Sequence, residues 1–245
     1  MLLGVPALLH AVLRGVTPEQ AAGLTWAQRA RVEREAAAFF ARLGARMRGV
    51  GAPGALIELA ERASLDEERH AAWATELAER LGVRGPAPED VAPREVVAGV
   101  PDDRRVLAEC AALSCVTESL STVALLAMRE RATRADVRAV LHEVLRDEIA
   151  HARLGWAYLS TVDDARAKAW LGRELPAIVD GAVTDELLSD EPEDAAMGAL
   201  EGLGCLSRAT RRAVFVAALR DVIAPGFDAC GVPTGALRER YARWL

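Results

Sequence analysis

Glu67-Glu68-Arg69-His70 and Glu148-Ile149-Ala150-His151 decide the fold of this 245-residue chain. Both stretches are Glu-x-x-His units that are far apart in the sequence. Residues i and i+3 share one face of an α-helix, so each unit can present a carboxylate oxygen and an imidazole nitrogen to one ion. The repeated pattern therefore predicts two helices that contribute matching pairs of metal ligands.

The polar and apolar residues around each unit show which way it faces. In a helix over residues 56–81, an advance of about 100° per residue puts Glu67 and His70 on the apolar face. In a helix over residues 133–160, Glu148 and His151 fall on the apolar face as well. Because surface Glu-x-x-His pairs are common, this phase is what makes the two units candidates for a buried site.

Two further helices each offer a single inward glutamate. In residues 104–131, Glu118 lies with the apolar residues, nearly opposite Glu109, which we expect to face solvent. In residues 25–48 there are two candidates, and Glu33 falls on the apolar face whereas Glu35 clusters with arginines on the polar face. We therefore expect Glu33 to point inward.

These residues form a complete set of donors for two metal ions. Four carboxylates and two imidazoles are the di-iron or di-manganese ligand set found in the core of some helix bundles. Four negative charges balance two divalent cations, so the buried site would be close to neutral. The alternative is that buried acids pair with arginine. The candidate ligands are Glu33, Glu67, His70, Glu118, Glu148 and His151.

The connections predict how the helices are arranged. Residues 49–54 and 132–134 are short, which makes helices one and two, and helices three and four, antiparallel hairpins. Residues 82–102 are rich in Gly and Pro. Twenty extended residues reach roughly 66 Å, more than the roughly 39 Å of a 26-residue helix, so this segment can cross the whole bundle. One long crossover is the ferritin-like topology.

In order and spacing, Glu33, Glu67-x-x-His70, Glu118 and Glu148-x-x-His151 resemble the ligands of the ferritin-like di-iron carboxylate superfamily. The likeness covers about residues 25–160. It implies an all-α fold: a ferritin-like four-helix bundle with one long crossover and additional C-terminal helices. It also implies two Fe ions as cofactors, with Mn or a mixed Mn/Fe pair as alternatives.

The resemblance is less specific about the reaction. It implies an oxidase or oxygenase that activates O2 and oxidises a small-molecule substrate, with Glu118 and Glu148 taking part in catalysis. The alternative is a ferroxidase, or an iron- or peroxide-handling protein, with no organic substrate. An electron donor and a homo-oligomer are both compatible with it. Arylamine N-oxygenases use an additional histidine, and the candidate here, His142, is expected on the surface.

Composition sets the remaining expectations. With 51% apolar residues and continuous helical patterns, residues 1–245 are expected to form a single domain. Within it we expect an N-terminal cap (1–24), the metal-binding bundle (25–160) and a C-terminal helical extension (161–245). A net charge of −6 with few aromatic residues argues against a nucleic-acid partner. The apolar start at residues 1–13 is too short to span a bilayer, so no membrane partner and a cytoplasmic location are expected.

Small residues accompany the ligands, including Ala60, Ala63, Ser114 and Cys115. They indicate either close helix packing or space beside the ions. Cys115 is expected to be a small buried apolar residue rather than a reactive thiol. Tyr158, two turns beyond His151, is expected in the core rather than as an electron relay.

Overall fold

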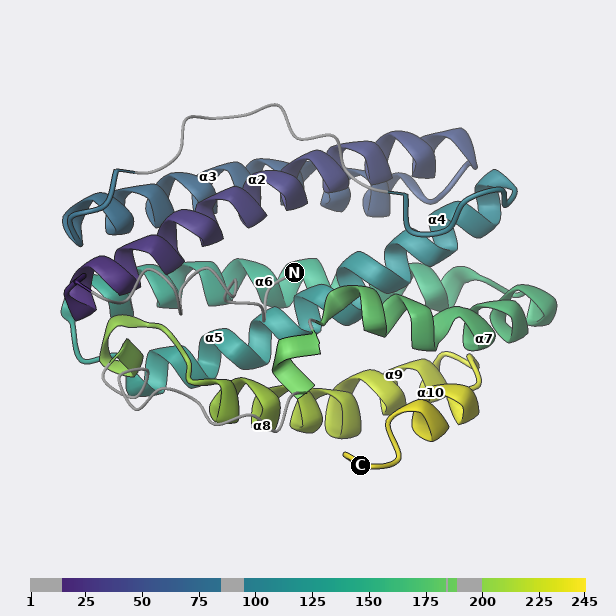
Figure 1. The fold of residues 1–245 in the computed structure, drawn as a ribbon. Coiled ribbons are helices and arrows are strands. Elements are labelled where there is room, and N and C mark those ends of the chain that lie inside the picture. The colour runs from purple at the N-terminus through teal and green to yellow at the C-terminus, as the bar shows by residue number, and fades with distance from the viewer. Residues whose placement is uncertain (1–14, 85–94, 184, 189–199) are drawn as a thin grey trace.

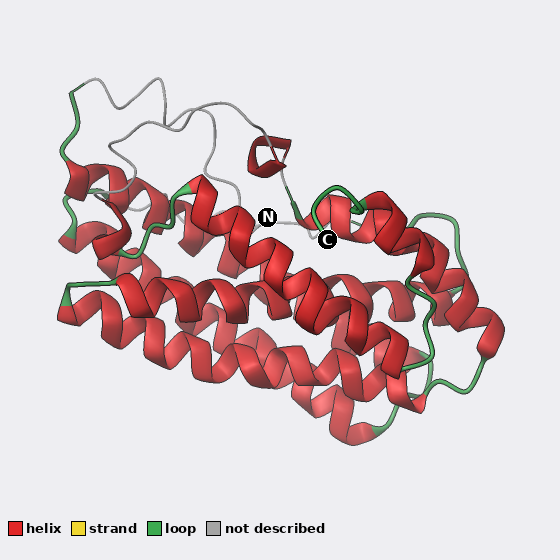
Figure 2. Cartoon of the chain, turned by 90° about the horizontal axis from the view of Figure 1, so that it is seen from below, coloured by secondary structure: helices red, strands yellow, loops and turns green. Residues whose placement is uncertain are grey.

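The computed structural model describes residues 15–84, 95–183, 185–188 and 200–245. Throughout this described part the regular elements are helices, and it contains no strand (Figure 2). The prediction of an all-α fold is therefore confirmed. The long helices lie side by side, and the C-terminal helices run along one side of them (Figure 1).

The first long helix, α2 (Pro18–Gly49), begins well before residue 25, where the sequence pattern placed its start. Its N-cap is Thr17, whose hydroxyl accepts a hydrogen bond from the Gln20 amide, while the Gln20 side chain accepts one from the Thr17 amide. This capping box and Pro18 in the first turn fix the start of the helix. Residues 18–24 therefore belong to the first bundle helix rather than to a separate cap, and residues 1–14 lie outside the described part.

The second helix, α3 (Gly54–Arg80), returns antiparallel to α2 (Figure 1). The turn between them closes with a hydrogen bond from the Ala52 amide to the Met47 carbonyl, 2.9 Å long. Gly51 in this turn has a φ of 70°, a conformation that costs glycine nothing. The predicted first hairpin is thus present.

The second hairpin also has the predicted order, but its first arm is not a uniform α-helix. Helix α4 (Asp102–Cys110) passes into a π-helical segment, η1 (Ala111–Glu118), and then into α5 (Ser119–Arg131). Residues 132–134 turn the chain into α6 (Ala135–Thr161), which runs back antiparallel. In Figure 1, α3 and the α4–α5 arm run in the same direction, so α3 ends and α4 begins at opposite ends of the bundle.

The C-terminal part packs against the α4–η1–α5 arm, where Figure 1 shows it as a further layer below the bundle. Trp156 of α6 contacts the Phe227 ring edge to face, with the ring centroids 5.1 Å apart. Tyr241 donates a 2.6 Å hydrogen bond to Asp180 and so ties the end of the chain to this layer. Its described elements are α7 (Ala165–Ala182), η2 (Asp185–Leu188), α8 (Arg208–Ala218), the π-helical η4 (Leu219–Ile223), α9 (Ala224–Ala229) and α10 (Gly235–Arg240).

Two of the prolines in this part do not interrupt the helices. Pro176 lies inside α7, although a proline within a helix typically costs about 3 kcal/mol. Leu171 and Leu175 on one side of it and Val179 on the other are fully buried, and this packing offsets the lost backbone hydrogen bond. Pro225 lies in the first turn of α9, where its missing N–H is tolerated.

The bundle interior contains two apolar clusters separated by a polar layer. One, the Trp26 cluster, includes Trp26, Leu77 and Leu141. The other, the Phe40 cluster, includes Phe40 and Leu154 and extends into the C-terminal helices. Along α2, α3 and α6, the candidate metal ligands fall between the residues of these two clusters. Apolar packing on both sides therefore keeps bulk water away from the ligand layer.

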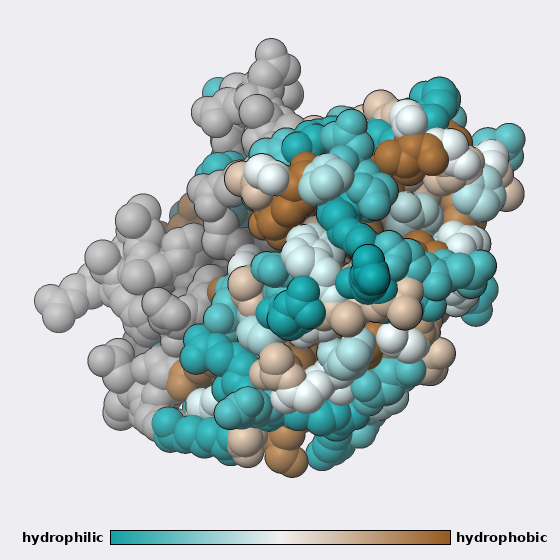
Figure 3. Space-filling model, turned by 90° about the vertical axis from the view of Figure 1, so that its right-hand side faces the viewer, coloured by the Kyte–Doolittle hydropathy of each residue, from teal (hydrophilic) through white to brown (hydrophobic). Residues whose placement is uncertain are grey.

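The Asp102–Arg131 stretch is long and apolar enough to cross a membrane by length and composition alone. However, 67% of its most apolar window is buried inside the protein, as is typical of a core helix. The end of the molecule formed by the α2–α3 and α6–α7 turns is mostly hydrophilic, with hydrophobic residues in small separate patches (Figure 3). The cytoplasmic location itself stays a prediction.

Candidate metal centre

The four arms of the bundle bring all six candidate ligands into the interior. Glu33 comes from α2, Glu118 from the junction of η1 and α5, and the two Glu-x-x-His units from α3 and α6. None of the six residues is more than 3% exposed. Glu35, the alternative to Glu33, lies outside and pairs with Arg31 at 3.2 Å. The orientations expected from helix phase are therefore those of the structure.

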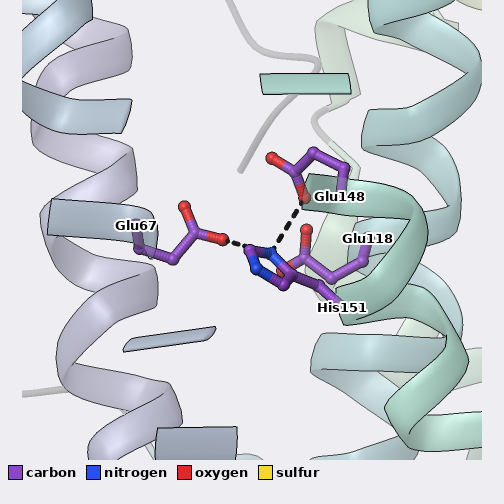
Figure 4. Close-up of side chains that lie close together, drawn as sticks. All are labelled: Glu67, Glu118, Glu148 and His151. Atoms are coloured by element: carbon purple, nitrogen blue, oxygen red, sulfur yellow. Dashed lines mark ion pairs between the residues drawn. The ribbon is translucent and has the colours of Figure 1, made fainter. Parts of the chain in front are cut away.

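Four of the six residues form one compact cluster. Glu67, Glu118, Glu148 and His151 each offer a ligand atom, and these four atoms all lie within 4.8 Å of one another. His151 Nδ1 lies 2.9 Å from Glu67 Oε1 and 3.5 Å from Glu148 Oε2, so it stands between acids from two different helices (Figure 4). A buried group of carboxylates and an imidazole at these separations can hold metal ions.

His70 lies beside the cluster and faces the same two acids. Its Nδ1 is 3.2 Å from Glu67 Oε2 and 3.9 Å from Glu148 Oε1. The His70 and His151 ring centroids are 5.8 Å apart. The two imidazoles thus direct the same ring nitrogen toward the same pair of carboxylates.

The other nitrogen of each histidine contacts an aspartate that the sequence pattern did not single out. His70 Nε2 is 3.2 Å from Asp147 Oδ2, and His151 Nε2 is 3.4 Å from Asp66 Oδ2. Each aspartate belongs to the opposite helix, so the partners are exchanged between α3 and α6. An acid behind a ligating histidine fixes its orientation and raises its basicity. The signal was available, because an Asp directly precedes the Glu in both Glu-x-x-His units.

Arg69 joins the two outer aspartates. Its Nη2 lies 2.8 Å from Asp66 Oδ1 and 2.7 Å from Asp147 Oδ2. Burial raises the pKa of Asp147, but the hydrogen bonds from Arg69 and His70 outweigh it and leave the pKa below its usual value. The corresponding position in the α6 unit is Ala150, so one arginine serves both histidine partners.

Glu33 occupies a different environment from the other acids. Its Oε1 accepts a 2.8 Å hydrogen bond from Arg29 Nε, and it is not among the four clustered residues. Burial raises its pKa to about 7; Arg29 opposes this shift, and the charges of Glu67 and Glu148 add to it. Pairing with arginine, the alternative considered for all the acids, thus occurs at Glu33. A metal-ligand role for Glu33 stays a prediction.

Several buried polar atoms at the centre have no hydrogen bond. Among the described residues, Glu67 Oε1, Glu148 Oε2 and His151 Nδ1 are buried without a hydrogen-bond partner, although His151 Nδ1 lies 2.9 Å from Glu67 Oε1 and 3.5 Å from Glu148 Oε2. A buried polar group without a partner costs about 1–3 kcal/mol. These atoms are of the types that ligate first-row metals, and a bound cation would satisfy all three at once. The residues present therefore fit a metal site.

The metal-free electrostatics show how strongly the groups interact. Burial raises the pKa of Glu118 well above its usual value, and the charge of Glu148 adds to the shift. For Glu148, the effect of burial is outweighed by the neighbouring Glu118 and by the charges of His151 and His70, and the pKa falls to about 2. Burial also opposes the charged histidines, yet contacts with Glu67 and Glu148 raise the pKa to about 9 for His70 and about 11 for His151.

Close helix packing positions Glu118 against α6. A Cβ built on Gly155 would lie 2.6 Å from both the Cys115 sulfur and the Ser114 Cβ, so only glycine lets α6 approach η1 this closely. At this point the small residues serve close packing, one of the two alternatives that the sequence left open. Cys115 is fully buried, as expected, and Tyr158 is buried in the Phe40 cluster.

One orientation was wrong. Glu109, expected to face solvent, is fully buried and pairs with Arg42 at 2.9 Å and with Arg46. Near the end of α2, its polar face lies against α4, so Glu109 forms ion pairs with the arginines of α2 instead of contacting water. His142, by contrast, is exposed as expected and lies 3.3 Å from Arg129.

Comparisons with known protein families, with curated proteins and with solved structures find no match for this chain. The assignment therefore depends on the geometry of the site. That geometry is a buried cluster of glutamates and histidine that could bind metal ions.

Proposed function

We propose that the chain is a ferritin-like protein that holds two first-row metal ions, most favourably iron, and uses them to oxidise a small organic substrate with O2. The observation that carries the proposal is the buried cluster of Glu67, Glu118, Glu148 and His151, in which three ligand atoms make no hydrogen bond. The hairpin order and the parallel α3 and α4–α5 arms support the ferritin-like topology.

The roles of the residues follow from their positions. Glu67, Glu118, Glu148 and His151 would hold the ions, with His70 and Glu33 completing the set. When bound, two ferrous ions supply electrons and open coordination positions for O2. Asp66 and Asp147 orient the histidines, and the apolar clusters on either side of the layer exclude water. Glu118 and Glu148 offer ligand atoms within 4.8 Å of each other, and burial with the charge of Glu148 raises the pKa of Glu118 well above its usual value, so Glu118 can hold a proton beside the metal site.

The first test is metal content. Reconstituted wild-type protein should contain two iron or manganese ions per chain, whereas the Glu67→Ala/Glu148→Ala variant should contain none. The matched control is Glu68→Ala/Glu143→Ala, which removes neighbouring acids from the outer sides of the same helices. Elemental analysis decides the outcome, and full metal content in the Glu67→Ala/Glu148→Ala variant would refute the site.

The second test separates organic oxidation from iron handling. Anaerobic Fe2+-loaded protein mixed with O2 should give a transient absorbance change that a suitable organic substrate alters. With excess Fe2+ in air, an oxidase should stop at the iron that its site holds. Continued growth of ferric mineral would instead assign the protein to iron handling.

A further inference from the structure

Arg29 is a buried cation whose charged tip points into the protein. Its side chain is only 11% exposed, and the terminal Nη2 atom is among the fully buried ones. Arginines near a surface usually bury the aliphatic stem and keep the guanidinium in water. The Arg29 guanidinium is instead largely out of water, which is costly unless its donors are used.

The donors of Arg29 are only partly used. Nε donates to Glu33 Oε1 at 2.8 Å, and Nη1 lies 3.6 Å from the thioether sulfur of Met128, which is a weak acceptor. Nη2 has no hydrogen-bond partner among the described residues. A guanidinium has five N–H donors, so much of its capacity for binding an anion is free.

Metal binding would increase this imbalance. Glu33 is the carboxylate partner of Arg29 and also a predicted metal ligand. An oxygen that donates to a divalent cation has less negative charge to offer an arginine. In the metal-loaded site, Arg29 therefore has a weaker ion pair with Glu33, and a second anion bound to its guanidinium would compensate for this loss.

The surroundings of Arg29 indicate which anion fits. Its guanidinium carbon lies 5.8 Å from the centre of the Trp26 ring, and its Nη1 lies 3.6 Å from the sulfur of Met128 in α5. One cation among apolar neighbours suits a monoanionic carboxylate with an apolar body, since a phosphate dianion would require more positive charge. Arg29 is one turn before Glu33 on α2, about 6 Å along the helix axis. An acid group bound there would leave the rest of the molecule within reach of the metal centre.

We infer that Arg29 binds the carboxylate of the organic substrate, and that the substrate is a small apolar acid. The inference depends on the proposed function for its meaning, but the binding can be tested without turnover. Manganese-loaded protein is titrated by calorimetry with sodium octanoate and, separately, with octanamide, the neutral analogue. Octanoate should bind about ten- to hundredfold more tightly than octanamide, the range expected for hydrogen bonds to a charged group.

Variants of Arg29 test whether octanoate binds at this residue. Arg29→Gln should weaken octanoate binding by about ten- to hundredfold, and Arg29→Lys should restore part of the affinity because it keeps the charge. Arg31→Gln is the matched control, because Arg31 is on the same helix but 52% exposed, and it should bind octanoate as the wild type does. Equal affinities for octanoate and octanamide in the wild type, or equal octanoate affinity in Arg29→Gln, would overturn the inference.

Metal content of the same samples separates this inference from the proposed function. Two ions per chain without octanoate binding would refute the role of Arg29 and leave the metal centre intact. Octanoate binding that depends on Arg29 in a protein that takes up no metal would support the acid-binding role of Arg29 and refute the metal centre. The comparison of octanoate with octanamide uses wild-type protein, so it holds even if a variant does not fold.

Discussion

The two hairpins look equivalent in sequence, since each contributes one single glutamate and one Glu-x-x-His unit, yet their single glutamates differ. Glu33 lies on the regular helix α2 and pairs with Arg29 at 2.8 Å. Glu118 ends a π-helical segment and clusters with Glu67, Glu148 and His151. A symmetric ligand pattern thus contains an asymmetric distribution of charge.

The difference appears in the cost of ionising the two acids. Burial raises the pKa of both, but Arg29 restrains the shift at Glu33, where the pKa reaches about 7. At Glu118 the charge of Glu148 adds to the effect of burial, and the pKa lies well above its usual value. A carboxyl with a raised folded-state pKa contributes stability at acidic pH that is lost as the pH rises through that pKa. At neutral pH, both acids therefore destabilise the metal-free protein, and Arg29 offsets part of this cost at Glu33.

The largest effect is expected when the two single glutamates are exchanged for neutral amides. Glu118→Gln should weaken metal binding by more than about a hundredfold, exceeding the usual loss on removing an outer partner. It should also stabilise the metal-free protein at pH 7.5, because glutamine carries no charge. Glu33→Gln should weaken metal binding by less than about tenfold and stabilise the metal-free protein less than Glu118→Gln does, because the lost Arg29 ion pair offsets the gain from removing a carboxyl with a raised pKa.

Chelator competition measures the metal affinities, and urea unfolding in the presence of chelator measures the stabilities. Glu35→Gln serves as the control, because Glu35 lies on the outer side of α2. Equal changes of metal affinity and of stability in Glu118→Gln and Glu33→Gln would show that the two single glutamates are equivalent.

The second-largest effect is expected when the aspartate that contacts either histidine across α3 and α6 is replaced by a neutral amide. Asp66→Asn and Asp147→Asn should each weaken metal binding by about ten- to hundredfold. Asp66→Asn should be the more severe, because its partner His151 belongs to the four-residue cluster and His70 lies beside it. Chelator competition compares both with Asp136→Asn, which changes an acid at the start of α6. Wild-type affinity in Asp66→Asn would contradict the role of the outer aspartates.

The smallest effect is expected for glycine-to-alanine substitutions at one helix contact in each hairpin. Gly155→Ala should destabilise the protein by roughly 1–2 kcal/mol, because the new Cβ would lie 2.6 Å from the Cys115 sulfur. Gly44→Ala on α2 should be neutral or stabilising by up to about 1 kcal/mol, because its nearest neighbour would be the Glu61 Cγ at 3.4 Å. Thermal unfolding measures both. A destabilisation of Gly44→Ala as large as that of Gly155→Ala would contradict the close approach at Gly155.

The sequence was sufficient for the helices and for the direction of the key side chains. Hydrophobic periodicity depends only on regular α-helix geometry, so it oriented Glu67, His70, Glu148 and His151 correctly on α3 and α6. Glycine and the short connections likewise indicated where both hairpins turn. These features are local, and local rules suffice for them.

The features that the sequence pattern missed are those that depend on an irregular helix or on contacts with another helix. Periodicity assumes 3.6 residues per turn, but η1 has the wider i→i+5 pattern of a π-helix, so phase does not carry over from Glu109 to Glu118. Glu109 is also buried by arginines from another helix, which no single-helix pattern contains. The Arg29–Glu33 pair has the i,i+4 spacing of an ordinary surface ion pair, and only tertiary packing shows that it is buried.

The exchange of histidine partners between α3 and α6 has a consequence for how the protein matures. The aspartate behind each imidazole comes from the other hairpin, so the complete donor geometry exists only after the two hairpins have docked. Metal binding should accordingly occur late in folding and stabilise a structure that is already nearly complete. Added manganese should therefore lower the unfolding rate far more than it raises the folding rate.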